Sequence, residues 1–166
     1  MKQLYAPWRS NYTLGISDKK NGKTCPFCVQ AADTNDAEHF IIKRYKHCFV
    51  MLNLYPYNAG HLMVIPYQHT GQLPELPAQA QHEIIDVVSH AVTILQTTLK
   101  AEGLNIGFNF GGKAAGGSIP EHLHLHVVPR WLGDTNFLVT LADTKPISFD
   151  LQKMYEQLQK AFEAAE

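Results

Sequence analysis

A row of alternating histidines is the feature that most constrains how this chain can fold. The segment His122-Leu-His-Leu-His126 places three of the nine histidines at every second position. Successive side chains of a β-strand point to opposite faces, so the pattern predicts a strand with three imidazoles on one face and leucines on the other. Histidine titrates near pH ~6.5, and such a row is therefore suited to chemistry at neutral pH.

The length and charge of the chain predict one domain, 1–166, with no global attraction to polyanions. The chain has 166 residues and a formal net charge of −1, which gives no field that would draw nucleic acid or an anionic membrane to it. No apolar run approaches the ~20 residues needed to cross a bilayer, and the N-terminal segment is too polar for a secretory signal. Three cysteines without an export signal indicate a reducing, cytoplasmic location.

The apolar pattern predicts an α+β fold with a mainly antiparallel sheet and two principal helices. Apolar residues at three- and four-residue spacing predict a long helix of about seven turns that closes near Gly103, and a second helix at 148–165. Most connections between strands are too short for crossover helices, so antiparallel pairing is expected. Besides the histidine strand, the predicted strands are 39–43, 48–54, 61–66 and 105–110.

The histidine row has three interpretations. Surface histidines on an edge strand are disfavoured, because three of them lie in register opposite an apolar face. One metal ion cannot readily collect all three, because His122 and His126 lie about 13 Å apart on an extended strand whereas zinc–nitrogen bonds are ~2.0–2.1 Å long; two of the three with a remote ligand remain an alternative. Covalent catalysis is favoured, because the glycine-rich segment 111–117 offers backbone N–H groups to phosphate and an imidazole can attack phosphorus.

These residues resemble the signature of the histidine-triad (HIT) superfamily, which reads His122-Leu-His124-Leu-His126-Val-Val in this chain. Asn53 and the segment 60–66 resemble the nucleotide-site strands of that family, and Asn109 with Gly116-Gly117 resembles its phosphate loop. The resemblance covers about residues 25–130. The branch that includes bacterial diadenosine tetraphosphate phosphorylases is similar in further segments, which are 5–12, 52–63, 115–118 and 128–137.

The resemblance implies a single HIT domain with an N-terminal extension at 1–24, paired into a homodimer. It implies an enzyme that cleaves dinucleoside polyphosphates by phosphorolysis or hydrolysis, through a nucleotidyl-histidine intermediate. His124 would be the nucleophile and His126 would contact phosphate oxygens. The nucleotide and its phosphates would be bound by Asn53, His61, Asn109, Gly116, Gly117 and Ser118.

One departure from the family pattern leaves the final acceptor open. Many members have Gly-Gln-Ser/Thr-Val before the histidines, whereas this chain has Gly117-Ser118-Ile119-Pro120. A polar group that assists the leaving group is therefore missing at position 119, and water and phosphate both remain candidate acceptors. A nucleoside phosphoramidase and a nucleotide-binding protein with little turnover are the alternative functions.

The pair Cys25-Pro-Phe-Cys28, taken together with the family resemblance, predicts a structural zinc site. Alone, the motif fits a zinc half-site, a redox pair or coincidence. A thioredoxin-like role would place it at a helix N-terminus after a buried parallel strand, and its loop-like sequence context does not predict this. Tetrahedral zinc needs two further ligands, which the resemblance implies are His69 and His122, although His69 also fits a solvated loop histidine. No cofactor is expected to be required for the chemistry itself.

Overall fold

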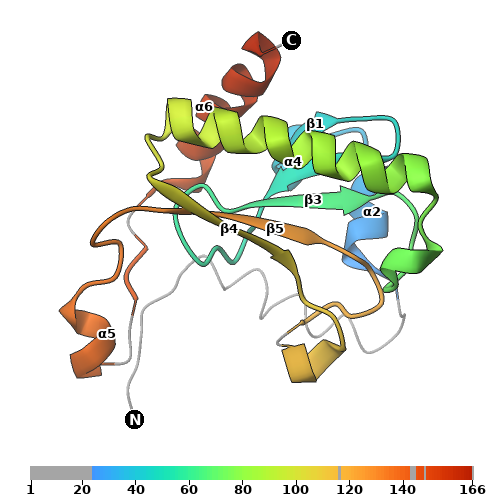
Figure 1. Ribbon diagram of the computed structural model, residues 1–166. Helices are drawn as coiled ribbons and strands as arrows, with labels where there is room; N and C mark the ends of the chain where they lie inside the picture. The colour runs from blue at the N-terminus through green and yellow to red at the C-terminus, as the bar shows by residue number, and fades with distance from the viewer. Residues whose placement is uncertain (1–23, 116, 143–144, 148, 166) are drawn as a thin grey trace.

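The computed structural model describes residues 24–115, 117–142, 145–147 and 149–165. Gly116 and the segment 5–12, which carry part of the family resemblance, lie outside these residues. The described chain forms one five-stranded sheet in the order β1-β2-β3-β5-β4, and every pairing in it is antiparallel (Figure 1). This confirms the α+β prediction. The strands are β1 (Ile41–Arg44), β2 (Cys48–Leu52), β3 (Leu62–Pro66), β4 (Gly103–Phe108) and β5 (Leu125–Arg130).

Two helices dominate the helical part, as predicted. They are α4 (Ala78–Thr98), with 21 residues, and α6 (Leu151–Ala164), with 14 residues. Three short helices are not predicted by the sequence pattern, because helices of four to seven residues are too short to show a clear 3.6-residue period. These are α2 (Pro26–Ala32), α3 (Asp36–His39) and α5 (Phe137–Ala142), and the 3₁₀ turns are η3 (Leu73–Glu75) and η4 (Gly112–Ala115).

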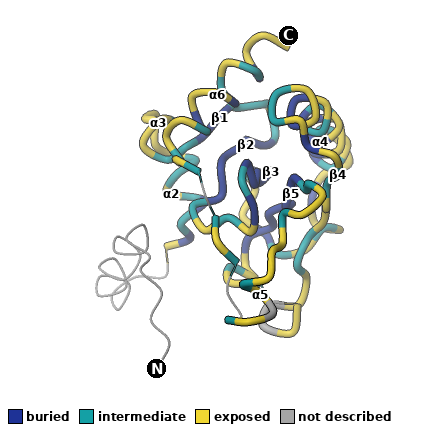
Figure 2. The backbone as a smooth tube through the Cα atoms, turned by 90° about the vertical axis from the view of Figure 1, so that its left-hand side faces the viewer, coloured by how far each residue is buried: buried dark blue, intermediate teal, exposed yellow. Residues whose placement is uncertain are grey.

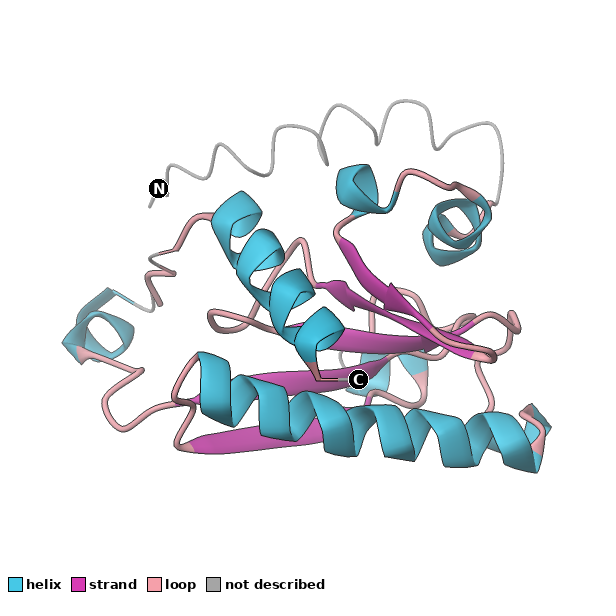
Figure 3. Cartoon of the chain, turned by 90° about the horizontal axis from the view of Figure 1, so that it is seen from above, coloured by secondary structure: helices cyan, strands magenta, loops and turns pink. Residues whose placement is uncertain are grey.

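The alternation of side chains along β2 and β3 divides the core between two faces of the sheet. Val50 and Val64 belong to the larger apolar cluster, which α4 and α6 complete on one face (Figures 1 and 3). Met51 and Met63 belong to a smaller cluster on the other face, which Phe27 of α2 joins. Both faces of the central strands are therefore covered, and Figure 2 shows their residues as buried.

Several predicted boundaries shift for local reasons. The long helix ends at Thr98, before the predicted Gly103, because Lys100 takes a left-handed conformation with φ 55°. β5 begins only at Leu125, where pairing with β3 and β4 begins, so His122 and His124 precede the strand. The backbone N–H of Leu123 instead donates to the carbonyl of Thr70, at 2.7 Å. The predicted alternation nevertheless holds, because Leu123 and Leu125 join the larger core whereas His124 and His126 line a cleft on the other side of the sheet.

No helix among the described residues is both long enough and apolar enough to span a membrane.

Candidate active site and metal site

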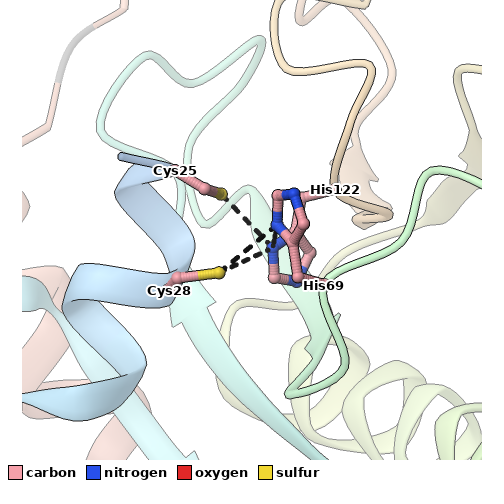
Figure 4. Close-up of side chains that lie close together, drawn as sticks. All are labelled: Cys25, Cys28, His69 and His122. Carbon is pink, nitrogen blue, oxygen red and sulfur yellow. Dashed lines mark hydrogen bonds between the residues drawn. The ribbon is translucent and has the colours of Figure 1, made fainter. Parts of the chain in front are cut away.

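The four predicted metal ligands meet in one cluster. Cys25 and Cys28 lie at the start of α2, His69 follows β3, and His122 precedes β5; Figure 4 shows their side chains pointing toward one another. The Nδ1 atom of His122 lies 3.3 Å from Cys25 Sγ, 3.5 Å from Cys28 Sγ and 3.2 Å from His69 Nδ1. His69 Nδ1 lies 3.3 Å from Cys28 Sγ, and the four ligand atoms are all within 4.8 Å of one another.

The donor set fits zinc in both spacing and protonation. Tetrahedral bonds of ~2.0–2.3 Å place neighbouring nitrogen and sulfur ligands about 3.3–3.8 Å apart, close to the distances above. The carbonyl oxygen of Pro66 accepts a hydrogen bond from His122 Nε2 at 2.8 Å, so the proton of the neutral ring is on Nε2 and the Nδ1 lone pair faces the cluster. Burial lowers the pKa of His122, which favours this metal-binding neutral form.

The Cys-x-x-Cys motif lies at a helix N-terminus, so the loop context that its sequence suggests is wrong. Cys25 is the N-cap of α2 and Pro26 takes its first position, where a missing N–H costs nothing. The other half of a thioredoxin-like arrangement is absent from the part of the chain that the structure describes, because all of its strand pairs are antiparallel. The motif serves the four-ligand cluster instead.

A glycine brings the two histidine-bearing segments of the cluster together. A Cβ atom on Gly71 would overlap the backbone carbonyl of Pro120. Only glycine permits this close approach, which places His69, two residues earlier, beside His122, two residues later. The hydrogen bond from Leu123 to the carbonyl of Thr70 closes the same contact.

A cleft of about 1360 Å³ opens beside the cluster, on the sheet face that carries Phe27, Met51 and Met63. Its volume exceeds the ~300–1,000 Å³ of typical small-molecule sites. Most of the predicted site residues line it, namely Asn53, Asn109, Ser118, His124 and His126. Gly117 is not among the lining residues. Cys25 and His69 also contribute, so the cleft adjoins the metal cluster.

His61 is not among the residues that line the cleft, so its predicted place in the nucleotide pocket stays a prediction. It is fully buried, and its ring contacts His126. The backbone N–H of Tyr57 donates to His61 Nδ1 at 3.1 Å, so the proton of the neutral ring is on Nε2. That proton is donated to His126 Nδ1 at 2.9 Å. His61 directly precedes β3 and lies on the same side of the sheet as Met63, from where it orients His126 through this hydrogen bond.

The same chain of hydrogen bonds fixes the proton of His126 toward the cleft. Since Nδ1 of His126 accepts from His61, its proton is on Nε2. The side-chain amide of Asn109 has its Nδ2 atom 3.2 Å from this nitrogen, so the amide accepts the proton through Oδ1 only when it is turned by 180°. Burial, with the neighbouring His124, lowers the pKa of His126 to about 4. Burial, with His126 and His124, lowers the pKa of His61 to about 3. Both rings are neutral at pH 7, and His126 is a neutral hydrogen-bond donor there.

His124 has the opposite tautomer, which suits a nucleophile. Its Nδ1 donates to the backbone carbonyl of His122 at 2.9 Å, so Nε2 carries the free lone pair. Its ring packs between those of Phe27 and His126, with centroid distances of 5.2 and 4.9 Å. A restrained imidazole with a free lone pair, next to a neutral N–H donor in a large cleft, can attack a phosphorus atom while its neighbour binds a phosphate oxygen.

Comparison with known proteins agrees with this geometry. Residues 34–131 match the HIT domain model. The chain belongs to the HIT family. It is 36% identical over 152 residues to a protein of Mycobacterium tuberculosis (strain CDC 1551 / Oshkosh) named AP-4-A phosphorylase, covering 89% of this chain and 77% of that protein.

Two solved HIT structures share the fold. A zinc-bound histidine triad family protein from Mycobacterium smegmatis has a TM-score of 0.67 and 28% identity, covering 86% of this chain and 98% of that one. A hypothetical histidine triad nucleotide-binding protein from Sulfolobus tokodaii strain7 has a TM-score of 0.65 and 29% identity, covering 85% and 91%. The HIT fold that the sequence implies is therefore confirmed.

The sequence did not identify two walls of the HIT cleft. One is the side of α2 that carries Phe27 and Gln30, and the other is the segment 147–151 before and at the start of α6, of which residue 148 is outside the described residues. The Pro-Phe pair between the cysteines is the one available signal for the first wall. The second wall has no such signal in the sequence, because the position of segment 147–151 depends on the path of the chain after α5.

The two neutral histidines predict a loss of stability in acid. The unfolded chain binds protons near pH ~6.5, whereas folded His61 and His126 bind them only near pH 3 to 4. The contribution of these two histidines to the free energy of unfolding should therefore be largest above pH 6.5. It should fall as the pH decreases, by up to ~1.4 kcal/mol per pH unit for each histidine. Urea unfolding between pH 7 and pH 5 measures this slope. His61→Gln should have a smaller slope than the natural protein, and equal slopes would contradict the prediction.

Proposed function

We propose that the protein cleaves dinucleoside polyphosphates, such as diadenosine tetraphosphate, through a nucleotidyl-His124 intermediate. One observation carries this proposal, which is the pair of opposite tautomers at the cleft. His124 has its lone pair on Nε2, and His126 has its proton on Nε2. The name of the M. tuberculosis relative, AP-4-A phosphorylase, supports the substrate class.

The proposed chemistry has two displacements at one phosphorus. Nε2 of His124 attacks the α-phosphorus, the bond from phosphorus to the bridging oxygen breaks, and the remaining nucleotide leaves. The carbonyl of His122 stabilises the positive charge that develops on the His124 ring, through the Nδ1–H bond. The Nε2–H of His126 donates to a phosphate oxygen, and Asn109 and Ser118 supply further polar contacts. Phosphate or water then attacks the same phosphorus and frees His124.

The products distinguish the two acceptors. Diadenosine tetraphosphate should give ATP and ADP when inorganic phosphate completes the second step, and ATP and AMP when water does. We expect ADP to be the main second product when phosphate is present, because the relative is named a phosphorylase. Chromatography of the products with and without phosphate makes the measurement. AMP at every phosphate concentration would assign a hydrolase instead.

Two rival functions give different results with the same protein. A nucleoside phosphoramidase would turn over adenosine 5′-phosphoramidate faster than diadenosine tetraphosphate. A nucleotide-binding protein with a vestigial triad would bind AMP and turn over neither compound.

We propose that Cys25, Cys28, His69 and His122 hold a structural zinc ion. When bound, the ion would tie the start of α2 to the segment that carries the nucleophile, and no proton or phosphoryl transfer passes through it. Two zinc-binding thiolates suit a reducing compartment such as the cytoplasm, and the three cysteines of the structure are free.

We propose that the protein is a homodimer that pairs through β4. This strand is at the edge of the sheet and its residues are half-buried or exposed, with Ile106 46% exposed. An exposed edge with an apolar side chain favours pairing with another strand. The strand at the opposite edge, β1, contacts both α3 and α6. Sedimentation equilibrium should give twice the 18.7 kDa chain mass, and a mass of one chain would contradict the dimer.

A further inference from the structure

One wall of the cleft contains a buried hydrogen-bond acceptor that has no partner. Gln30 of α2 lines the cleft, and its Oε1 atom is buried without a hydrogen bond to any described residue. Buried polar atoms in folded proteins nearly always have partners, and an unpaired one costs free energy. An unpaired acceptor in the wall of a binding cleft indicates that a ligand supplies the donor.

The position of Gln30 relates it to the nucleophile. Gln30 follows Phe27 by three residues in α2, so both side chains lie on the same face of the helix, with Gln30 about 4.5 Å farther along its axis. The Phe27 ring is 5.2 Å from the His124 ring. The carboxamide is therefore about one helical turn from the ring that packs on the nucleophile.

The surroundings of Gln30 suit a nucleobase better than a phosphate. The apolar side chains of Pro26, Phe27, Met51 and Met63 line the same cleft, and the last three belong to one cluster that includes the ring of Phe27 on the helix of Gln30. Aromatic and methionine side chains pack well against the flat faces of a base. None of these four side chains is charged or can donate a hydrogen bond to a phosphate. The polar side chains of the cleft that can donate one, such as those of Asn109 and Ser118, come from other segments of the chain.

We infer that Gln30 is a specificity-determining residue that accepts a hydrogen bond from the exocyclic amine of adenine. The adenine is that of the nucleotide whose phosphorus His124 attacks, so the inference rests on the proposed function. A carboxamide pairs with the amine and an adjacent ring nitrogen of adenine in the geometry that Asn and Gln use on that base. A base with no donor at C6 leaves Oε1 unpaired in the bound state.

The test compares two nucleotides that differ only in that amine. AMP and purine riboside 5′-monophosphate, which has hydrogen at C6, are titrated into the natural protein, Gln30→Met and Val29→Met by calorimetry. Methionine keeps the length of glutamine and removes its polar atoms. Val29 is the neighbouring residue, is 50% exposed and does not line the cleft, so Val29→Met is the matched control.

The natural protein and Val29→Met should bind AMP about 5- to 150-fold more tightly than the analogue, the range that one buried hydrogen bond to a base supplies. Gln30→Met should bind both nucleotides with equal affinity, through a loss of AMP affinity alone. Unequal binding that persists in Gln30→Met, or equal binding by the natural protein, overturns the inference.

The same measurements separate this inference from the proposed function. Turnover of diadenosine tetraphosphate with no preference for AMP over the analogue leaves the proposed function intact and overturns the role of Gln30. Failure of the natural protein to bind either nucleotide overturns both. Urea unfolding of Gln30→Met, with a midpoint no lower than that of Val29→Met, shows that a lost preference arises from the cleft and not from misfolding.

Discussion

Replacement of His124 by alanine is expected to reduce the turnover of diadenosine tetraphosphate by a factor of at least ~10³. The variant removes the atom that we propose forms the covalent bond to phosphorus, and the neighbouring imidazole of His126 does not offer a free lone pair to the cleft. His126 does not replace it, because its Nδ1 accepts from His61 and its Nε2 carries the proton. Initial rates of product formation, measured by chromatography at saturating substrate, give the factor.

The neighbouring histidine supplies the matched control. His126→Asn should keep a polar side chain beside the phosphate and lose less activity than His124→Ala, because it removes a donor and not the nucleophile. Both variants should bind AMP. Turnover by His124→Ala at the rate of the natural protein would contradict the covalent mechanism. Failure to trap a nucleotidyl-protein by rapid quenching of the natural protein would contradict it as well.

Substitution of Cys25 by serine is expected to abolish zinc binding and to lower the free energy of unfolding by at least ~3 kcal/mol. The cluster joins α2 to the segments after β3 and before β5, and without the ion only weak thiol–imidazole hydrogen bonds hold these segments together. Metal analysis should find one zinc per natural chain and none in the variant, and urea unfolding measures the stability.

Cys48 provides the control for that experiment. It is also a buried free cysteine, but it lies in β2 beside Glu83 and outside the cluster. Burial, with Glu83, raises the pKa of its thiol, so it is a neutral core residue. Cys48→Ala should keep one zinc per chain. Unchanged zinc content in Cys25→Ser would contradict the assignment of the cluster, and a second zinc per chain would favour a metalloenzyme that uses His124 and His126 as ligands.

The two experiments meet at His122, which belongs to both halves of the site. Its Nδ1 faces the metal cluster, while its backbone carbonyl accepts the proton of His124 Nδ1. The proposed zinc ligand and the proposed nucleophile are therefore two residues apart, and both of their rings pack on Phe27. In this arrangement the three histidines would have three roles without competing for one ion.

The sequence by itself determined the residues that could do chemistry and the periods of the elements that carry them. Alternation of histidine with leucine places one apolar face and one polar face on an extended chain. The 3.6-residue apolar period of α4 predicts a helix with one apolar face that packs on the core. These patterns are local, which is why the α+β fold and the division between core and cleft could be predicted from them.

Only the tertiary structure decided which histidine holds which proton. Tautomers depend on partners distant in sequence, such as the carbonyl of Pro66 for His122 and the ring of His61 for His126. The same holds for the approach of Gly71 to Pro120 and for the unpaired Oε1 of Gln30. Hydrogen bonds and steric contacts between remote segments leave no periodic trace in a sequence, because either partner alone fits many other environments.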